Sequence, residues 1–337
     1  MTGELVLVTG VSSFLGFATT VSALESGYRI RAIVRKAAQI DDIRSAIPAQ
    51  YNDKIDFVVI PDLTSAGVLD EPAKDVDHIV HVASPANITT TDFKKDYLVP
   101  ARDMTLAVLK AASKANAVKR VVVTSSLSPY IPISEFVTGQ FSRDVFRSDD
   151  EICHYNIDDE FKVQLFAYAA SKSIAIDTAE AYSKTNKPSF GVVFIVPSFV
   201  FGPNKLSKTV EDFNSGSNAI MLKYLVGTSK DPLLTVSVHI DDVAKAHVLS
   251  LKPSVPTGRY ILDSEGPGST SWSDALPFVK KYYPSAVGTV FDENVTPAAV
   301  KIVLDNSKAE KAFGIKFKSF EEQVKDTVGY YLSLTSK

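Results

Sequence analysis

Short runs of apolar, mostly β-branched residues alternate with longer segments of mixed character through the first two hundred residues of the chain. The runs are LVLVT (5–9), RIRAIV (29–34), IDFVVI (55–60), HIVHVA (78–83), RVVVTSS (120–126) and FGVVFIV (190–196). They are continuous rather than alternating, which is typical of parallel strands that are covered on both faces. Helices are predicted between them, near residues 14–26, 92–116 and 160–185. This order predicts an α/β fold with a doubly wound parallel sheet and right-handed crossovers.

The alternation ends at residue 203, so residues 1–203 are predicted to form the larger domain. Two later apolar runs, LLTVSVHI (233–240) and RYILD (259–263), are expected to return to that domain as further strands. Residues 204–232 are polar and contain Gly and Ser, and residues 264–337 mix Pro, aromatic residues and short helical patterns. These two segments are predicted to form a smaller, C-terminal substrate-binding lobe.

Composition limits the range of partners. The chain has 337 residues, a net charge of −3 and no long basic run, which argues against nucleic acid or an anionic membrane surface as partner. Its single cysteine, Cys153, excludes an internal disulfide and suits a reducing compartment. No apolar run approaches the roughly 20 residues of a membrane helix, and the first strand begins too early for a signal segment. We therefore expect a soluble, cytoplasmic protein.

The stretch VTGVSSFLG (8–16) follows the first predicted strand and opens the first predicted helix. Gly10 and Gly16 are placed where a cofactor pyrophosphate approaches the backbone at a helix N-terminus, and Ser13 stands where a third glycine is usual. Two glycines alone are also compatible with an ordinary turn. The position in the strand–helix series favours a variant cofactor loop in which the Ser13 hydroxyl faces a phosphate. The predicted cofactor-binding residues here are Thr9, Gly10, Ser12, Ser13, Phe14, Leu15 and Gly16.

The end of the second predicted strand bears on the choice of cofactor. NAD-binding proteins usually carry Asp or Glu there, whereas an Arg accommodates the 2′-phosphate of NADP. This chain has Arg35 and Lys36, and its next carboxylate, Asp41, lies well into the following helix. Solvated charges on a surface turn are the alternative. The placement favours a phosphate-binding role and so predicts NADP(H) as cofactor.

Tyr168 and Lys172 are four residues apart in AYAASK (167–172), so they share one face of a predicted helix. A nearby ammonium lowers the pKa of a phenol by roughly 1–3 units, which would make the tyrosine a proton donor near neutral pH. Such a pair is expected about once by chance in a chain of this composition. Its context carries more weight, because Thr124 and Ser126 end the fifth strand at the ligand-binding edge of the sheet. The alternative is a surface pair beside a serine-capped turn.

Several motifs occur in order along nearly the whole chain: VTGVSSFLG, VRK, PDL (61–63), HVASP (81–85), VVVTSS, YAASK, VPSFVFGP (196–203) and HIDDVAKAH (239–247). Together they resemble the extended short-chain dehydrogenase/reductases, which have a Rossmann fold. The resemblance is strongest to the branch with dihydroflavonol 4-reductase, cinnamoyl-CoA reductase and the yeast methylglyoxal and aldehyde/ketone reductases. The stretch DDEICHYNIDDEF replaces a Glu-Glu-Ser-Trp-like segment of this branch, so the substrate stays open.

The resemblance implies a role for each matching residue. Tyr168 would be the general acid, Lys172 its partner and a ribose ligand, and Ser126 the donor that orients the substrate carbonyl. Further cofactor contacts are implied on the adenine side, beside strand four, at the end of strand five and along the nicotinamide: Asp62, Leu63, Ala83, Ser84, Thr124, Pro197, Ser198 and Val200.

We therefore predict an NADPH-dependent carbonyl reductase, monomeric or homodimeric, that acts on a small aldehyde or ketone. Its substrate pocket is expected to be apolar and aromatic, lined by Pro85, Ser126, Tyr130, Ile131, Phe166, Phe199 and Phe201. One alternative is an NAD-dependent nucleotide-sugar epimerase or dehydratase, against which Arg35 argues. Another is a catalytically silent NADP(H)-sensing protein, against which the intact Ser126, Tyr168 and Lys172 argue.

No metal site is predicted. His78 and His81 are three apart on a strand, so they point to opposite faces and are poorly placed to bind one ion. His239 and His247 flank a helix start, which is more typical of capping and packing than of metal ligation. Cys153 has no activating base nearby in the sequence and is expected to be unreactive.

Overall fold

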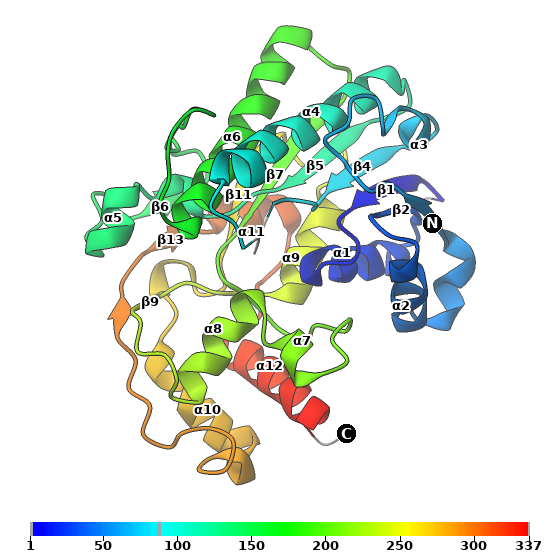
Figure 1. Cartoon of the computed structure of the whole chain (residues 1–337). Coiled ribbons are helices and arrows are strands. Elements are labelled where there is room, and N and C mark those ends of the chain that lie inside the picture. Colours follow the sequence, from blue (N-terminus) through cyan, green and yellow to red (C-terminus); the bar gives the residue numbers. More distant parts are fainter. Residues whose placement is uncertain (1–2, 86–88, 336–337) are drawn as a thin grey trace.

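A seven-stranded parallel sheet forms the centre of the computed structural model, which describes residues 3–85 and 89–335 (Figure 1). The order of its strands is β11-β7-β5-β4-β1-β2-β3. Their bounds are β1 (Leu5–Thr9), β2 (Arg29–Val34), β3 (Ile55–Val59), β4 (His78–His81), β5 (Arg120–Thr124), β7 (Gly191–Pro197) and β11 (Gly258–Leu262). The predicted doubly wound parallel sheet is confirmed.

Helices cover both faces of this sheet (Figure 1). They are α1 (Phe14–Glu25), α2 (Ala38–Ala46), α3 (Asp70–Ala73), α4 (Val99–Lys114), α6 (Gln164–Asn186), α9 (Ile240–Leu249) and α11 (Ser307–Phe313). A π-helical turn at Lys94–Leu98 precedes α4, so the predicted helix at 92–116 begins irregularly. In β1, Leu5 and Leu7 belong to one buried cluster while Val6 and Val8 belong to another. Both sides of the strand are therefore buried, which explains its continuous apolar sequence.

The strand order reverses between β1 and β4. From β1 the chain winds outward through β2 and β3, and it then returns to β4 on the other side of β1. In open α/β sheets, ligands bind in the crevice at the carboxyl ends of the strands where the order reverses. The loops that follow β1 and β4 meet there, since a Cβ atom on Gly10 would lie 2.6 Å from the Ala83 nitrogen.

The later part of the chain adds short strands in pairs outside the main sheet. These are β8 (Val200–Phe201) with β10 (Val238–His239), β9 (Leu233–Leu234) with β12 (Ala299–Val300), and β6 (Phe146–Arg147) with β13 (Leu304–Asp305). The prediction of one strand over 233–240 is therefore wrong in detail. This segment splits because its first half pairs with β12 and its second half with β8. The run at 259–263 does add a strand, β11, to the edge of the main sheet.

A third buried cluster lies among the remaining helices. These are α7 (Val210–Phe213), α8 (Gly216–Leu225), α10 (Ala275–Tyr282) and α12 (Phe320–Thr335), whereas Phe136 of α5 (Ile133–Thr138) packs against the first cluster. Trp272 is at its centre, with ring contacts to Phe201, Tyr224 and Phe320. Figure 1 shows α7, α8, α10 and α12 together on one side of the sheet. The division into a nucleotide-binding domain and a substrate-binding lobe stays a prediction.

Across residues 3–85 and 89–335, no helix combines the length and the apolar character needed to cross a membrane.

Candidate active site

The loop between β1 and α1 depends on its two glycines for different reasons. Gly10 has a φ of +77°, and a side chain there would also collide with the backbone of Ala83. A Cβ atom on Gly16 would lie 2.0 Å from the Gly10 carbonyl oxygen, so the helix can start this close to the strand only with glycine. The turn and the close approach of helix and strand are thus built into this stretch.

Ser13 takes a different role from the one predicted. Its Oγ accepts a hydrogen bond from the Gly16 amide at 3.1 Å and donates one to the Gly10 carbonyl at 2.8 Å, which makes it the N-cap of α1. The hydroxyl is directed into the loop rather than toward a phosphate. The amides of Phe14 and Leu15, in the first turn of α1, have no intrahelical acceptor, and such amides are suited to an anion.

Arg35 and Lys36 follow directly after β2, and both side chains are exposed. Neither guanidinium nor ammonium has an ion pair or hydrogen bond within the described ranges, so both cations are available to a ligand. Their backbone amides donate to Gln39 Oε1 at 3.0 and 3.1 Å, and Gln39 Nε2 donates to Ser12 Oγ at 2.9 Å. Gln39 is a residue of this region that the motifs did not predict. The sequence does contain a signal for it, since a Gln three residues after Lys36 is half of a capping-box pattern.

Ser126, Tyr168 and Lys172 converge at the carboxyl end of β5. Ser126 Oγ accepts hydrogen bonds from the Ser128 amide and hydroxyl at 3.2 and 3.1 Å, and its hydroxyl lies near enough to the Tyr168 phenol to lower the pKa of that phenol. The buried Lys172 Nζ donates to the Thr124 carbonyl at 2.9 Å and lies 5.8 Å from the centre of the Tyr168 ring. The structure therefore brings together the three residues that were singled out, on two neighbouring elements.

The ionisation of this group differs from the prediction. Burial raises the pKa of Tyr168, and the Ser126 hydroxyl opposes that rise only in part. Burial also lowers the pKa of Lys172 to about 8. The prediction that the Lys172 ammonium lowers the pKa of Tyr168 is wrong. The Lys172 ammonium is directed at the Thr124 carbonyl, and the loss of water outweighs its attraction for a phenolate.

Two buried histidines support the strands around this group. His247 Nδ1 donates to the Val243 carbonyl at 2.8 Å, so its Nε2, 2.7 Å from Thr124 Oγ1, accepts from that hydroxyl. His81 Nδ1 lies 2.8 Å from Thr9 Oγ1. Burial lowers the pKa of His81 to about 3 and that of His247 to about 4, so both are neutral in the fold.

The other histidines and the cysteine also have local explanations. His239 caps α9 by accepting from the Asp241 amide at 3.1 Å, so the predicted capping and packing roles of His239 and His247 are confirmed. His78 Nε2 lies 3.6 Å from Glu4 Oε2, away from the partner of His81. Burial raises the pKa of the Cys153 thiol, which disfavours the nucleophilic thiolate as predicted. The described residues contain no group of three or more His, Cys, Asp or Glu arranged to hold a metal.

The remaining predicted cofactor positions lie at the ends of the central strands. The Asp62 carboxylate accepts from the Thr64 amide and hydroxyl at 2.8 and 2.7 Å, and these bonds lower its pKa. The Ala83 amide donates to Thr9 Oγ1 at 3.3 Å. The others are half-buried or buried at the ends of strands: Leu63 and Ser84 follow β3 and β4, Pro197 ends β7, Ser198 comes next, and Val200 begins β8.

Three of the predicted pocket residues are in the core instead. Tyr130, Ile131 and Phe201 are no more than 1% exposed. The Tyr130 hydroxyl donates to the Ser148 carbonyl at 2.9 Å, and the Phe201 ring packs edge-on against Trp272. Packing between segments far apart in the sequence covers these side chains, which an apolar pattern does not reveal. Pro85 is also buried, whereas Phe166 and Phe199 are half-buried.

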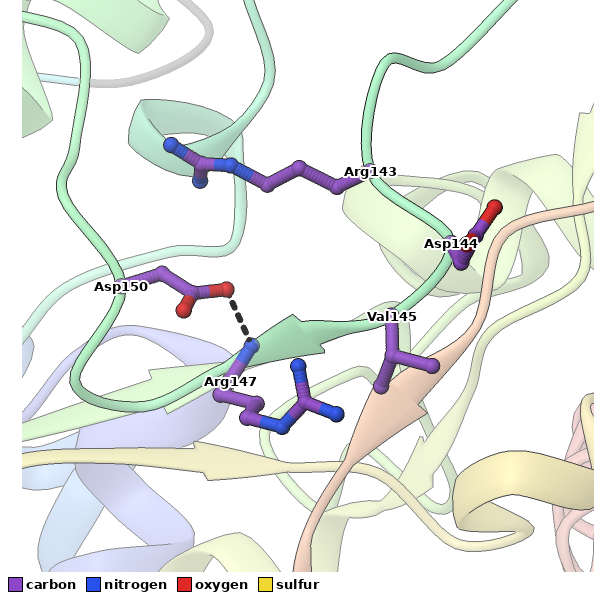
Figure 2. A pocket seen from close by; sticks show the side chains of 5 residues that line it. All are labelled: Arg143, Asp144, Val145, Arg147 and Asp150. Atoms are coloured by element: carbon purple, nitrogen blue, oxygen red, sulfur yellow. Dashed lines mark hydrogen bonds between the residues drawn. The ribbon is translucent and has the colours of Figure 1, made fainter.

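The protein has two surface cavities of note, and Phe14, a predicted cofactor residue, lines the second. Figure 2 shows the first, of about 370 Å³, in which the Asp150 carboxylate accepts from the Arg147 amide at 2.7 Å. It is lined by Arg143, Asp144, Val145, Arg147 and Asp150. The second, of about 460 Å³, lies between α1, α9 and the segment after Pro203. Ser126, Tyr168 and Lys172 line neither cavity.

Comparison with known proteins agrees with this geometry. The chain matches the NAD dependent epimerase/dehydratase family over residues 6–261. It is 32% identical to ketoreductase CTB6 of Cercospora beticola, over 100% of this chain and 97% of that protein. It is 31% identical to ketoreductase sphI of Aspergillus fumigatus, over 100% of both chains.

The fold is also found among solved structures. Yeast methylglyoxal/isovaleraldehyde reductase Gre2, complexed with NADPH, superposes with a TM-score of 0.83 at 24% sequence identity, covering 98% of this chain and 99% of that one. At this identity the likeness supports the fold. With the family match over residues 6–261, and with relatives more than 30% identical over the whole chain, this protein belongs to the NAD dependent epimerase/dehydratase family of extended short-chain dehydrogenase/reductases.

Proposed function

We propose that this protein is an NADPH-dependent oxidoreductase that reduces the carbonyl group of a small aldehyde or ketone. The observation that carries the proposal is the convergence of Ser126, Tyr168 and Lys172 at the end of β5. Two full-length relatives named ketoreductases support the reaction type. A solved structure of the same fold, whose title names NADPH, supports the cofactor.

The chain fits a dinucleotide with a 2′-phosphate. The first-turn amides of α1 suit a pyrophosphate, and the unpaired cations of Arg35 and Lys36 suit a further phosphate at the end of β2. When bound, the nicotinamide of NADPH supplies the hydride that reduces the carbonyl carbon. Everything else in the reaction falls to the side chains of this protein.

Tyr168 is the proton donor. Its raised pKa keeps the phenol protonated at neutral pH, as a donor to a developing alkoxide must be. Ser126, whose hydroxyl acts on the pKa of Tyr168, is placed to bind the same substrate oxygen and to orient the carbonyl. The Lys172 ammonium stabilises the phenolate that remains after transfer, because a charge in a dry site acts strongly at short range.

The alternatives account for fewer observations. An NAD-dependent nucleotide-sugar epimerase or dehydratase shares the fold and the Tyr–Lys pair, but it leaves Arg35 and Lys36 without a function. A protein that only senses NADP(H) has no need of the Ser126, Tyr168 and Lys172 arrangement. A cytoplasmic location and a monomeric or homodimeric state remain predictions.

A direct test uses the purified full-length chain with a panel of aliphatic and aromatic aldehydes and ketones. We expect oxidation of NADPH that depends on the carbonyl compound, with one alcohol formed for each NADPH consumed. Nucleotide sugars form a parallel panel that is assayed without added reductant. Conversion of a nucleotide sugar, together with no carbonyl reduction, would replace the proposed function by the epimerase alternative.

A further inference from the structure

Gln39 joins two loops that are far apart in the sequence. Its Oε1 accepts hydrogen bonds from the amides of Arg35 and Lys36 at 3.0 and 3.1 Å. Its Nε2 donates to Ser12 Oγ in the glycine loop at 2.9 Å. One side chain thus uses its acceptor on the turn after β2 and its donor on the turn after β1. These are the two turns assigned above to the 2′-phosphate and the pyrophosphate.

Apart from the Gln39 side chain, backbone hydrogen bonds hold the turn after β2: the Gln39 amide donates to the Lys36 carbonyl at 3.1 Å, and the Ile40 amide donates to the Ala37 carbonyl at 3.0 Å. At residue 35 the chain leaves the hydrogen-bonded strand β2, which ends at Val34. The residue that precedes α2, Ala37, has no side chain able to cap the helix. Gln39 Oε1 instead reaches back from the first turn of α2 to the amides of Arg35 and Lys36, which precede the helix, much as the Glu or Gln of a capping box reaches back to the N-cap amide. The glycine loop is different, since the Ser13 bonds to Gly10 and Gly16 hold it without Gln39.

We propose that Gln39 is a positioning residue for cofactor selection, which holds the Arg35–Lys36 turn at a set distance from the glycine loop. The inference rests on the proposed use of NADPH. A ligand that spans both turns benefits only if their spacing matches its two phosphate groups, whereas a ligand without a 2′-phosphate needs the glycine loop alone. Gln39 should therefore affect NADPH binding more than NADH binding.

The test compares Gln39→Leu with Gln50→Leu. Gln50 is exposed, and its side chain makes no hydrogen bond within the described ranges, so its replacement is the same chemical change without the link. Dissociation constants for NADPH and NADH are measured by fluorescence titration, and for adenosine 2′,5′-bisphosphate by calorimetry. We expect Gln39→Leu to weaken NADPH and the bisphosphate about tenfold and NADH by no more than about threefold. Gln50→Leu should change none of these constants.

A double-mutant cycle with Ser12→Ala tests the link itself. Because Ser12 is itself a predicted cofactor contact, the quantity compared is the ratio of the NADPH and NADH dissociation constants. If Gln39 acts through Ser12, this ratio should be the same in the double variant as in Gln39→Leu alone, because both changes remove the same connection. Additive changes in the ratio would mean that the two loops are not coupled through this contact and would overturn the proposal. Retained NADH binding shows that each variant is folded.

Failure of the inference and of the proposed function are distinguishable. Equal losses of NADPH and NADH in Gln39→Leu, or no loss of either, would overturn the positioning role while wild-type preference for NADPH stands. A wild type that binds NADH as tightly as NADPH, and does not bind the bisphosphate, would overturn both.

Discussion

The Tyr168 phenol lies on the same helix face as the Lys172 ammonium, and burial favours the neutral form of both side chains. It raises the pKa of Tyr168 and lowers the pKa of Lys172. A dry site penalises every charge in it, so a protonated phenol is the resting state of the tyrosine. The phenol therefore carries a proton that it can donate when a carbonyl is reduced. The neighbouring side chain that lowers the pKa of Tyr168 is Ser126, whereas the Lys172 ammonium donates to the Thr124 carbonyl.

Tyr168→Phe should lower kcat by about 100-fold or more, because it removes the transferable proton and leaves the ring. The dissociation constant of NADPH should stay within about twofold of wild type. Tyr155→Phe is the matched control, since Tyr155 packs in the same cluster as Tyr168 and loses only a hydroxyl. Steady-state kinetics and a fluorescence titration measure the two quantities. A Tyr168→Phe enzyme with half the wild-type kcat would remove the assignment of the proton donor.

Arg35→Asp should lower the ratio of kcat/KM for NADPH to kcat/KM for NADH by about tenfold or more, because a charge-assisted contact to the 2′-phosphate becomes a repulsion. The preference for NADPH would thereby narrow or reverse. Arg29→Asp makes the same charge change at the opposite end of β2, where the residue is also exposed, and should leave the preference unchanged. The ratio of kcat/KM values for the two cofactors is the measurement. Equal ratios in both variants would show that Arg35 does not select the cofactor.

At the scale of elements, Ser13 is the N-cap of α1 at a position where related loops often have glycine, and the structure shows why a serine is tolerated there. The Ser13 side chain closes the first turn of the helix, so it serves the loop from within. Gly10 and Gly16 are needed because they have no side chain, since each lies against backbone atoms that cannot move aside.

Ser13→Ala should lower the free energy of unfolding by about 1 kcal/mol, since it removes the N-cap of α1. Ser13→Gly should cost only a few tenths of a kcal/mol, because glycine is itself tolerated at an N-cap. Urea unfolding followed by circular dichroism gives both values. An alanine variant as stable as wild type would mean that the capping hydrogen bonds contribute nothing to stability.

Gly10→Val should abolish measurable NADPH binding, because a β-branched residue resists the positive φ and meets the Ala83 backbone. Gly314→Val is a control for glycine loss, since Gly314 also has a positive φ but has open space around it, far along the chain. Fluorescence titration with NADPH, with folding checked by circular dichroism, compares the two. Wild-type affinity in a folded Gly10→Val protein would reduce the stretch to an ordinary turn.

At the scale of the whole molecule, strands and helices distant in sequence are tied together by buried polar contacts at the site. His247 on α9 holds Thr124 on β5, and His81 on β4 holds Thr9 on β1. Both rings are neutral in the fold because burial lowers their pKa values. In the unfolded chain a histidine has an ordinary pKa, so below about pH 6.5 the unfolded state binds more protons than the folded state.

The stability that His247 contributes should therefore be present above pH 6.5 and lost as the pH falls toward its folded pKa of about 4. His247→Gln removes this titration. The advantage of wild type over His247→Gln in unfolding free energy should shrink by about 2 kcal/mol between pH 7 and pH 5. Asp263 titrates with the opposite sign, since burial raises its pKa to about 7, and comparing the two proteins cancels its effect. A difference that does not change with pH would mean that His247 is charged in the fold.

The sequence by itself determined the features that depend on local pattern. Continuous apolar runs specify strands buried on both faces, and a four-residue spacing places Tyr168 and Lys172 together on any helix. Gly10 and Gly16 mark a tight turn wherever a strand passes directly into a helix. For these reasons the sheet, the glycine loop and the three converging side chains could be predicted from residue order alone.

Only the tertiary structure decided the properties that depend on what surrounds a side chain. Tyr130 and Phe201 read as pocket residues, but Ser148 and Trp272 from later segments cover them. The pKa of Tyr168 rises because neighbouring elements exclude water from it. The contact of Gln39 with Ser12 arises only because α2 lies beside the glycine loop in the fold. Burial and long-range hydrogen bonds arise from the packing of distant segments, and a local pattern of residues does not contain that information.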